Sequence, residues 1–80
     1  MPKHDPAALV AFLDERSDYS MDDRPRRLRK TINGVRVSET DQRMIRRWRK
    51  GDIKAVTDAS ARALLRRFKI NPKEFTDAPV

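Results

Sequence analysis

The 80-residue sequence contains no cysteine and only one histidine, which limits the chemistry that it can support. Without cysteine there is no disulfide framework and no thiolate metal site. The single histidine, His4, lies near the amino terminus, where we expect a flexible segment and a solvent-exposed ring without a functional role. We therefore predict no metal site and no bound cofactor.

Long apolar runs and glycine-rich segments are also missing. No stretch approaches the roughly 20 apolar residues that cross a bilayer, and no signal-peptide pattern opens the chain. We expect a cytoplasmic protein without a membrane partner. The two glycines, Gly34 and Gly51, stand apart, so there is no glycine-rich loop for nucleotide phosphates. No small-molecule ligand is evident.

The residue groupings on which common enzyme mechanisms rest are absent as well. No serine or cysteine nucleophile is matched by a histidine and a carboxylate. The cluster of Asp14, Glu15 and Asp18 lacks the spacing of a calcium loop. Asp22 and Asp23 read as charge at a helix start rather than as a catalytic pair. We predict no catalytic residue and no enzymatic activity.

Acidic residues are scarce in the middle of the chain. Residues 24–54 hold twelve basic and three acidic side chains, a net charge of +9, whereas residues 1–23 have a net charge of −4. Nine of the twelve basic residues are arginine, which suits paired hydrogen bonds to phosphate and guanine. This basic block predicts a nucleic-acid partner.

One helix, over residues 38–50, occupies the second half of the basic block. Ser38 and Asp41 have the spacing of a capping box, in which each side chain bonds the other residue's backbone N–H. Gly51 follows at the position where a helix end favours a positive φ. Arg49 and Lys50 place positive charge at the negative end of the helix dipole. These signals mark both ends of the helix.

The two sides of this helix differ in character. At roughly 100° per residue, Met44, Ile45 and Trp48 fall on one side, with Asp41 one turn earlier. We expect that side to pack against the core, with Trp48 buried. Negative charge is confined to the first turn, so the other side favours an anionic partner over internal salt bridges. That outer side holds Glu39, Gln42, Arg43, Arg46, Arg47 and Lys50.

Further helices are predicted on both sides of it. Asp5 and Pro6 begin a helix over residues 6–16. A Ser-x-x-Asp signature at Ser20 predicts another over residues 21–32, or from residue 23 or 24 if Pro25 is too costly. Thr57 caps a helix over residues 58–69, and residues 71–74 begin a last turn. The apolar positions of these helices include Leu9, Phe12, Leu13, Leu28, Ile32, Ala61, Leu64, Leu65 and Phe68.

The fold class that follows is all-α: one compact domain of four to five helices, with flexible tails at residues 1–4 and 76–80. Asn33 and Gly34 form a strong turn signal. Residues 35–37 are read as a connection, because three residues cannot make a sheet, with Val35 or Val37 filling a gap between helices. The helix before this turn and the helix after it form a predicted helix-turn-helix.

Two segments carry a likeness to known proteins: I-R-R-W-R-K-G at residues 45–51 and A-R-A-L-L-R-R-F-K-I-N-P-K-E-F at residues 61–75. The first resembles the end of the recognition helix of the lambda-repressor-like, Cro-type (XRE) family of DNA-binding domains. The second resembles that family's fourth helix and the entry to its fifth. The likeness extends over residues 8–75 and is most specific after Ile45.

The chain also departs from that family. Family members usually open their second helix with Gln-x-x-Leu-Ala, where residues 26–30 here read R-R-L-R-K. Their capping serine usually lies closer to the tryptophan than the ten positions between Ser38 and Trp48. The helix therefore begins at Ser38 or at Asp41. Related helix-turn-helix types, including phage excisionase-like proteins, stay open.

The resemblance implies a sequence-specific regulator of transcription that binds double-stranded DNA, commonly as a dimer on a palindromic operator. We predict a phage or prophage type of repressor or a Cro-like protein, inserting helix 38–50 into the major groove, with a homodimer forming on DNA. The alternatives are an excisionase-like or architectural DNA-binding protein, a small basic RNA-binding protein and a protein-interaction module. Four of the five aromatic residues occupy predicted core positions, which disfavours stacking on single-stranded RNA.

Candidate contact residues follow from how side chains read DNA. Arginine bonds guanine, glutamine bonds adenine, and the first half of a recognition helix meets base edges. We expect base contacts from Gln42, Arg43 and Arg46, with Thr40 or Glu39 added if the helix begins at Ser38. We expect phosphate contacts from Arg26, Arg27, Lys30, Arg36, Ser38, Arg47, Lys50 and Lys54.

Overall fold

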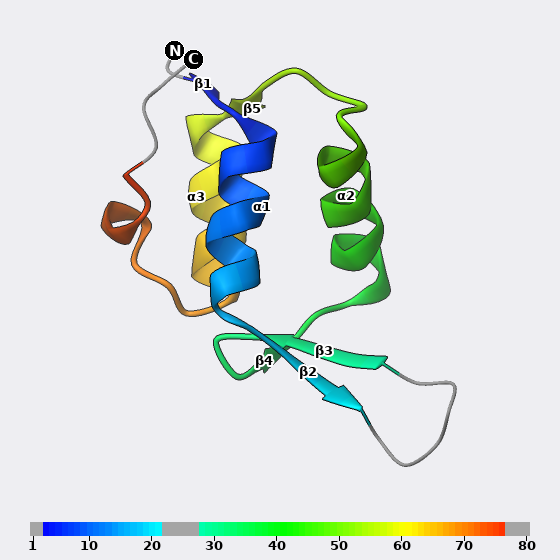
Figure 1. The fold of residues 1–80 in the computed structure, drawn as a ribbon. Helices are drawn as coiled ribbons and strands as arrows, with labels where there is room; N and C mark the ends of the chain where they lie inside the picture. Colours follow the sequence, from blue (N-terminus) through cyan, green and yellow to red (C-terminus); the bar gives the residue numbers. More distant parts are fainter. Residues whose placement is uncertain (1–2, 22–27, 77–80) are drawn as a thin grey trace.

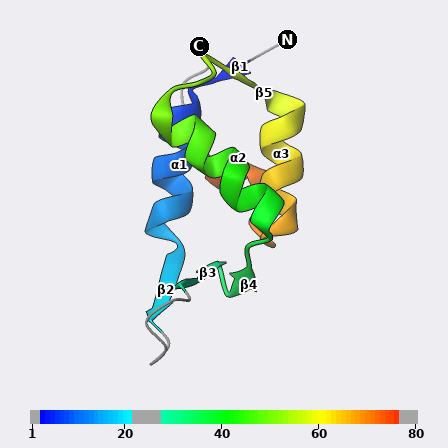
Figure 2. The same ribbon diagram turned by 90° about the vertical axis from the view of Figure 1, so that its right-hand side faces the viewer.

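The computed structural model describes residues 3–21 and 28–76. Within these ranges, three α-helices enclose one apolar core (Figure 1). Helices α1 and α3 lie side by side, and α2 crosses them on one face (Figures 1 and 2). No helix of the described ranges is long and apolar enough to cross a membrane. The helices are α1 (Pro6–Glu15), α2 (Glu39–Lys50) and α3 (Asp58–Arg67), followed by a short 3-10 helix, η1 (Pro72–Glu74).

Two small antiparallel sheets lie at opposite ends of the helices (Figure 1). At one end of the molecule, β1 (Lys3–His4) pairs with β5 (Val56–Thr57). At the other end, three strands follow in the order β2, β3, β4. Their bounds are β2 (Ser17–Met21), β3 (Leu28–Ile32) and β4 (Val35–Arg36).

The all-α prediction of four to five helices is therefore wrong. Strands β2 and β3 occupy much of the span in which a helix over residues 21–32 was expected. The reason lies at Asn33 and Gly34, whose φ angles of 51° and 76° are both positive. Two such residues form a type I′ turn, which joins paired strands, and Ile32 pairs with Val35 directly across it.

The β3–β4 hairpin, which this turn forms, also corrects two related expectations. Residues 35–37 are not a bare connection, because Val35 and Arg36 pair with β3 as strand β4; Val37 then fills the core as expected. The described element that leads into the turn is the strand β3 and not a helix, so the predicted helix-turn-helix is absent from the described chain. The alternative helix starts at residues 23 and 24 lie outside the described residues, as do Arg26 and Arg27.

The helix starts that were read from Asp5, Ser38 and Thr57 are confirmed, whereas Ser20 lies in strand β2 and begins no described helix. Asp5 caps α1 and Thr57 caps α3, each by accepting a backbone N–H from its first turn. Ser38 caps α2 by accepting the N–H of Asp41 at 3.2 Å, so the helix begins after Ser38 and not after Asp41. Gly51 ends α2 with a φ of 83°. Both boundaries of the central helix therefore agree with the sequence.

The apolar core lies where the three helices meet β3. Leu9 and Leu13 of α1 and Ile32 of β3 are completely buried. Phe12 instead lies at the edge, with its ring centroid 5.3 Å from that of Phe75. From α2 onward the core residues are Ile45, Trp48, Val56, Ala61, Leu64, Leu65, Phe68 and Ile70.

The prediction that His4 is exposed in a flexible segment is wrong. Lys3 and His4 form β1, and His4 is only 7% exposed. Its Nε2 lies 2.7 Å from Oδ1 of Asp58, at the start of α3, and its ring packs against Phe75. This hydrogen bond lowers the pKa of the Asp58 carboxyl, and the nearby Arg62 guanidinium acts in the same direction. The amino-terminal strand is thereby fastened to α3.

Candidate nucleic-acid interface

A line of exposed side chains follows the outer face of α2. Glu39, Arg43, Arg46 and Lys50 are spaced by four, three and four residues, which aligns them along one side of a helix. All four are exposed, and the buried residues of α2 face the opposite way. We call these four residues the α2 stripe. Figure 2 views the molecule from the side on which α2 lies in front of α1 and α3.

The cations of this face have no anionic partner among the described residues. Arg43, Arg46 and Lys50 of the α2 stripe, and Arg47 beside it, take part in none of the ion pairs formed within residues 3–21 and 28–76. Their charges are therefore available to a partner. Exposed cations gathered on one helix face attract polyanions, and most strongly at low salt.

Other arginines of the chain are paired with carboxylates of neighbouring helices. Arg49, on the flank of α2, donates to both carboxylate oxygens of Asp14 in α1, at 2.7 and 3.0 Å. Arg67 of α3 donates to Asp41 of α2 at 2.9 Å. Carboxylates thus balance these two arginines, whose ion pairs link neighbouring helices, and the outer face of α2 keeps a positive charge.

Asp14 and Asp41 are positioning residues that the sequence reading did not assign. Asp41 is 9% exposed, and its carboxylate accepts from Arg67 instead of reaching back to the Ser38 amide as the capping box predicted. Its place on the apolar side of α2 was a signal that it needed a buried partner. The partner itself lies 26 residues away, beyond what local spacing can reveal.

The predicted base-reading residues differ in their surroundings. Glu39, Gln42, Arg43 and Arg46 line a shallow hollow of about 210 Å³ on α2. Gln42 is half-buried, and its Nε2 donates to the Val37 carbonyl at 3.0 Å. This bond uses one of the two N–H groups of the amide and holds the side chain toward the segment before α2, whereas an adenine contact needs the amide oxygen and an N–H to face the base together.

The predicted phosphate-contacting residues also separate into groups. Arg36 on β4 and Lys54 after α2 are exposed. Ser38 is exposed too, and its hydroxyl, which accepts from Asp41, still has its own proton to donate. Lys30 differs: its side chain is 14% exposed and its Nζ lies 3.9 Å from Asp14. Lys30 therefore faces α1 rather than a partner.

The β2–β3 hairpin adds a second projection on this side of the molecule. In Figure 1 it extends from below the helices toward the side on which α2 lies. Residues 22–27, which join its two strands in the sequence, lie outside the described residues, and the predicted contacts Arg26 and Arg27 are among them. Helix α2 and the hairpin are the two elements that face a partner approaching from this side.

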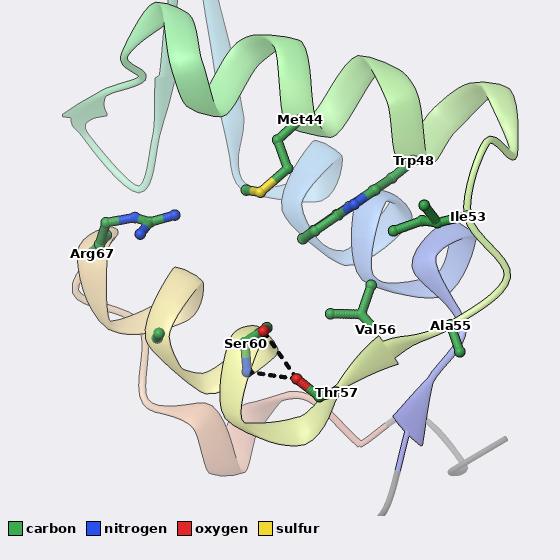
Figure 3. Close-up of a pocket in the computed structure, with 9 residues that line it drawn as sticks. Met44, Trp48, Ile53, Ala55, Val56, Thr57, Ser60 and Arg67 are labelled. Carbon is green, nitrogen blue, oxygen red and sulfur yellow. Dashed lines mark hydrogen bonds between the residues drawn. The ribbon is translucent and has the colours of Figure 1, made fainter.

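The opposite side of α2 is apolar and faces α3. A groove of about 400 Å³ runs between the two helices and the connection that joins them. Met44, Trp48, Ile53 and Val56 line it, and Arg67 lies at one end (Figure 3). Trp48 is 6% exposed, which confirms that it is buried, and its ring lies in the groove toward the connection and α3 (Figure 3). This side fixes the position of α2.

Comparison with known proteins adds no relative. No protein-family model matches the chain, and no curated protein and no solved structure matches it. The resemblance of residues 45–51 and 61–75 to the Cro-type family stays a prediction. The function must therefore be argued from the fold and from the charges on α2.

Proposed function

We propose that this protein is a sequence-specific regulator of transcription that binds double-stranded DNA by inserting α2 into the major groove. The observation that supports the proposal is the cationic outer face of α2, whose arginines and lysine pair with no carboxylate among the described residues. By contrast, Arg49, Arg62 and Arg67 of α2 and α3 each form an ion pair with an aspartate. A helix of 12 residues is about 18 Å long and 10–12 Å wide. The major groove, about 12 Å wide, accepts such a helix.

Within this arrangement the residues have two kinds of role. Glu39, Thr40, Arg43 and Arg46 lie in the first two turns of α2, where a helix entering the groove meets base edges. The remaining exposed residues surround them and suit phosphate contacts, which fix orientation without reading sequence. These phosphate-contacting residues are Arg36, Ser38, Arg47, Lys50 and Lys54.

A homodimer on DNA fits this function, because one short helix reads few base pairs and two copies would read half-sites about one DNA turn apart. The regulator class that we propose is a phage or prophage repressor or Cro-like protein acting in the cytoplasm. Its sequence support rests on residues 45–51 and 61–75 alone, because the segment expected to complete a helix-turn-helix is a β-hairpin.

An architectural or excisionase-like DNA-binding protein is the second candidate, and the β2–β3 hairpin beside α2 favours it. Proteins that bend DNA often place strands or arms in the minor groove next to the main contact. Energy transfer between dyes at the two ends of a bound duplex separates the candidates. A regulator that reads straight DNA leaves the transfer unchanged, whereas a bending protein raises it.

The direct test of DNA binding is a titration of a labelled mixed-sequence duplex at several salt concentrations. Four phosphate contacts would lower log K by about 3–4 for each tenfold rise in salt. Single-stranded RNA of the same length is the comparator and should bind more weakly, since the outer face of α2 carries no aromatic residue for stacking. A salt slope near zero, or tighter binding to the RNA, would contradict the proposal.

A further inference from the structure

We infer that the α2 stripe reads G·C base pairs, with Arg43 and Arg46 bonding guanine and Glu39 selecting cytosine. This inference rests on the DNA-binding function proposed above and names the class of site that the protein prefers. Two features of the hollow on α2 lead to it: one N–H of the Gln42 amide is held by the Val37 carbonyl, and a carboxylate lies among cations that pair with no described residue.

The first feature restrains the adenine reader of this helix. Glutamine recognises adenine by accepting from N6 and donating to N7 with the same amide. One N–H of the Gln42 amide donates instead to the Val37 carbonyl, which ties the start of α2 to the chain after β4. The amide keeps its oxygen and its second N–H, but the bond to Val37 restrains the direction in which they point. Arg43 and Arg46, which line the same hollow, can both bond the O6 and N7 acceptors of guanine.

The second feature is the carboxylate of Glu39 in an otherwise cationic surface. Glu39 is exposed and forms no ion pair with any described residue, although Arg43 lies one turn further along the same face. Its place in the first turn is favourable for the helix dipole. On DNA, however, a carboxylate is repelled by phosphates and by the acceptor atoms of guanine and thymine. It is tolerated where it accepts a hydrogen bond from an amino group, as from cytosine N4.

The spacing along α2 relates the two contacts. Four residues separate Glu39 from Arg43, which corresponds to a rise of about 6 Å. Base pairs follow each other at about 3.4 Å, so for a helix that lies along the groove the two side chains meet positions about two steps apart. The preferred site should contain a cytosine and a guanine at that separation. The Glu39 carboxylate would select cytosine both by accepting its amino hydrogen bond and by repelling the acceptor atoms of other bases.

The test is selection of bound duplexes from a random pool by the wild type, Glu39→Gln and Glu74→Gln. Glu74 is the matched control: it is also an exposed glutamate, but it lies on η1, on the side of the molecule away from α2 (Figures 1 and 2). Both variants remove one negative charge. We expect the wild type to enrich sites with guanine and cytosine at fixed positions. Glu39→Gln should lose about tenfold of the preference for cytosine at one position, while Glu74→Gln keeps the wild-type pattern.

Three results would overturn the inference. Enrichment of sequences read only at A·T pairs would show that the arginines do not read guanine. An unchanged cytosine preference in Glu39→Gln would show that its carboxylate does not face a base. Enrichment of no sequence, with duplex binding retained, would mean that α2 contacts only the backbone. Absence of duplex binding altogether would reject the proposed function along with the inference, and is thereby distinguishable from the first three.

Discussion

Residues of one type have different environments in this chain, according to partners that lie far away in the sequence. Arg43 and Arg49 are both exposed on α2, yet Arg49 bonds Asp14 of α1 and Arg43 bonds no described residue. Helical periodicity predicted the outward direction of Arg43 but could not reveal the pairing of Arg49, because Asp14 is 35 residues distant. His4 was read wrongly for the same reason, since its partner Asp58 is 54 residues away.

The His4–Asp58 contact leads to a prediction about acid stability. Its hydrogen bond lowers the pKa of Asp58 below the ordinary value of 3.8 in the folded protein. The stabilisation is complete above that value and is lost as the pH falls through the lower folded-state pKa. Asp58→Asn should therefore show a flatter fall in melting temperature below about pH 4 than the wild type, measured by circular dichroism. Asp52→Asn, at an exposed position, is the control, and equal slopes for all three proteins would contradict the assignment.

At the scale of elements, local signals predicted the helices well and the hairpin badly. The caps Asp5, Ser38 and Thr57 each begin a helix in the structure, because a cap acts within one turn. The Ser20-x-x-Asp23 signature looked the same but lies where β2 ends. The type I′ turn at Asn33 and Gly34 favours a hairpin, and strand pairing with residues 17–21 depends on contacts that no local window contains.

The packing of α2 against α3 yields a prediction about folding stability. Trp48→Ala should lower the free energy of unfolding by about 3–5 kcal/mol, because it leaves a cavity between the two helices. That is a large part of the roughly 5–15 kcal/mol that stabilises a typical domain. Met44→Ala is the comparison: Met44 lines the same groove but is only half-buried, so its loss should be smaller. Urea unfolding measures both, and an unaffected midpoint for Trp48→Ala would contradict the packing described here.

At the scale of the whole molecule, two sides differ in the kind of side chain that they carry. On the side with η1, the ring of Phe75 packs against the rings of His4 in β1 and Phe12 in α1. The other side presents the α2 stripe, with the hairpin projecting beside it (Figure 1). The net charge of +9 in residues 24–54 predicted a cationic surface, but only the fold shows which of the described cations form ion pairs with carboxylates.

The most direct test of this account compares two triple variants in binding to one duplex. Each removes three exposed cations, one set from the α2 stripe and one from α3 and the segment after it, so the change in net charge is the same. We expect the first to weaken binding about 100-fold or more and the second by less than about threefold, with both folded by circular dichroism. Equal losses would mean that net charge, and not α2, governs binding, which would contradict the central claim. The variants are Arg43→Gln/Arg46→Gln/Lys50→Gln and Arg66→Gln/Lys69→Gln/Lys73→Gln.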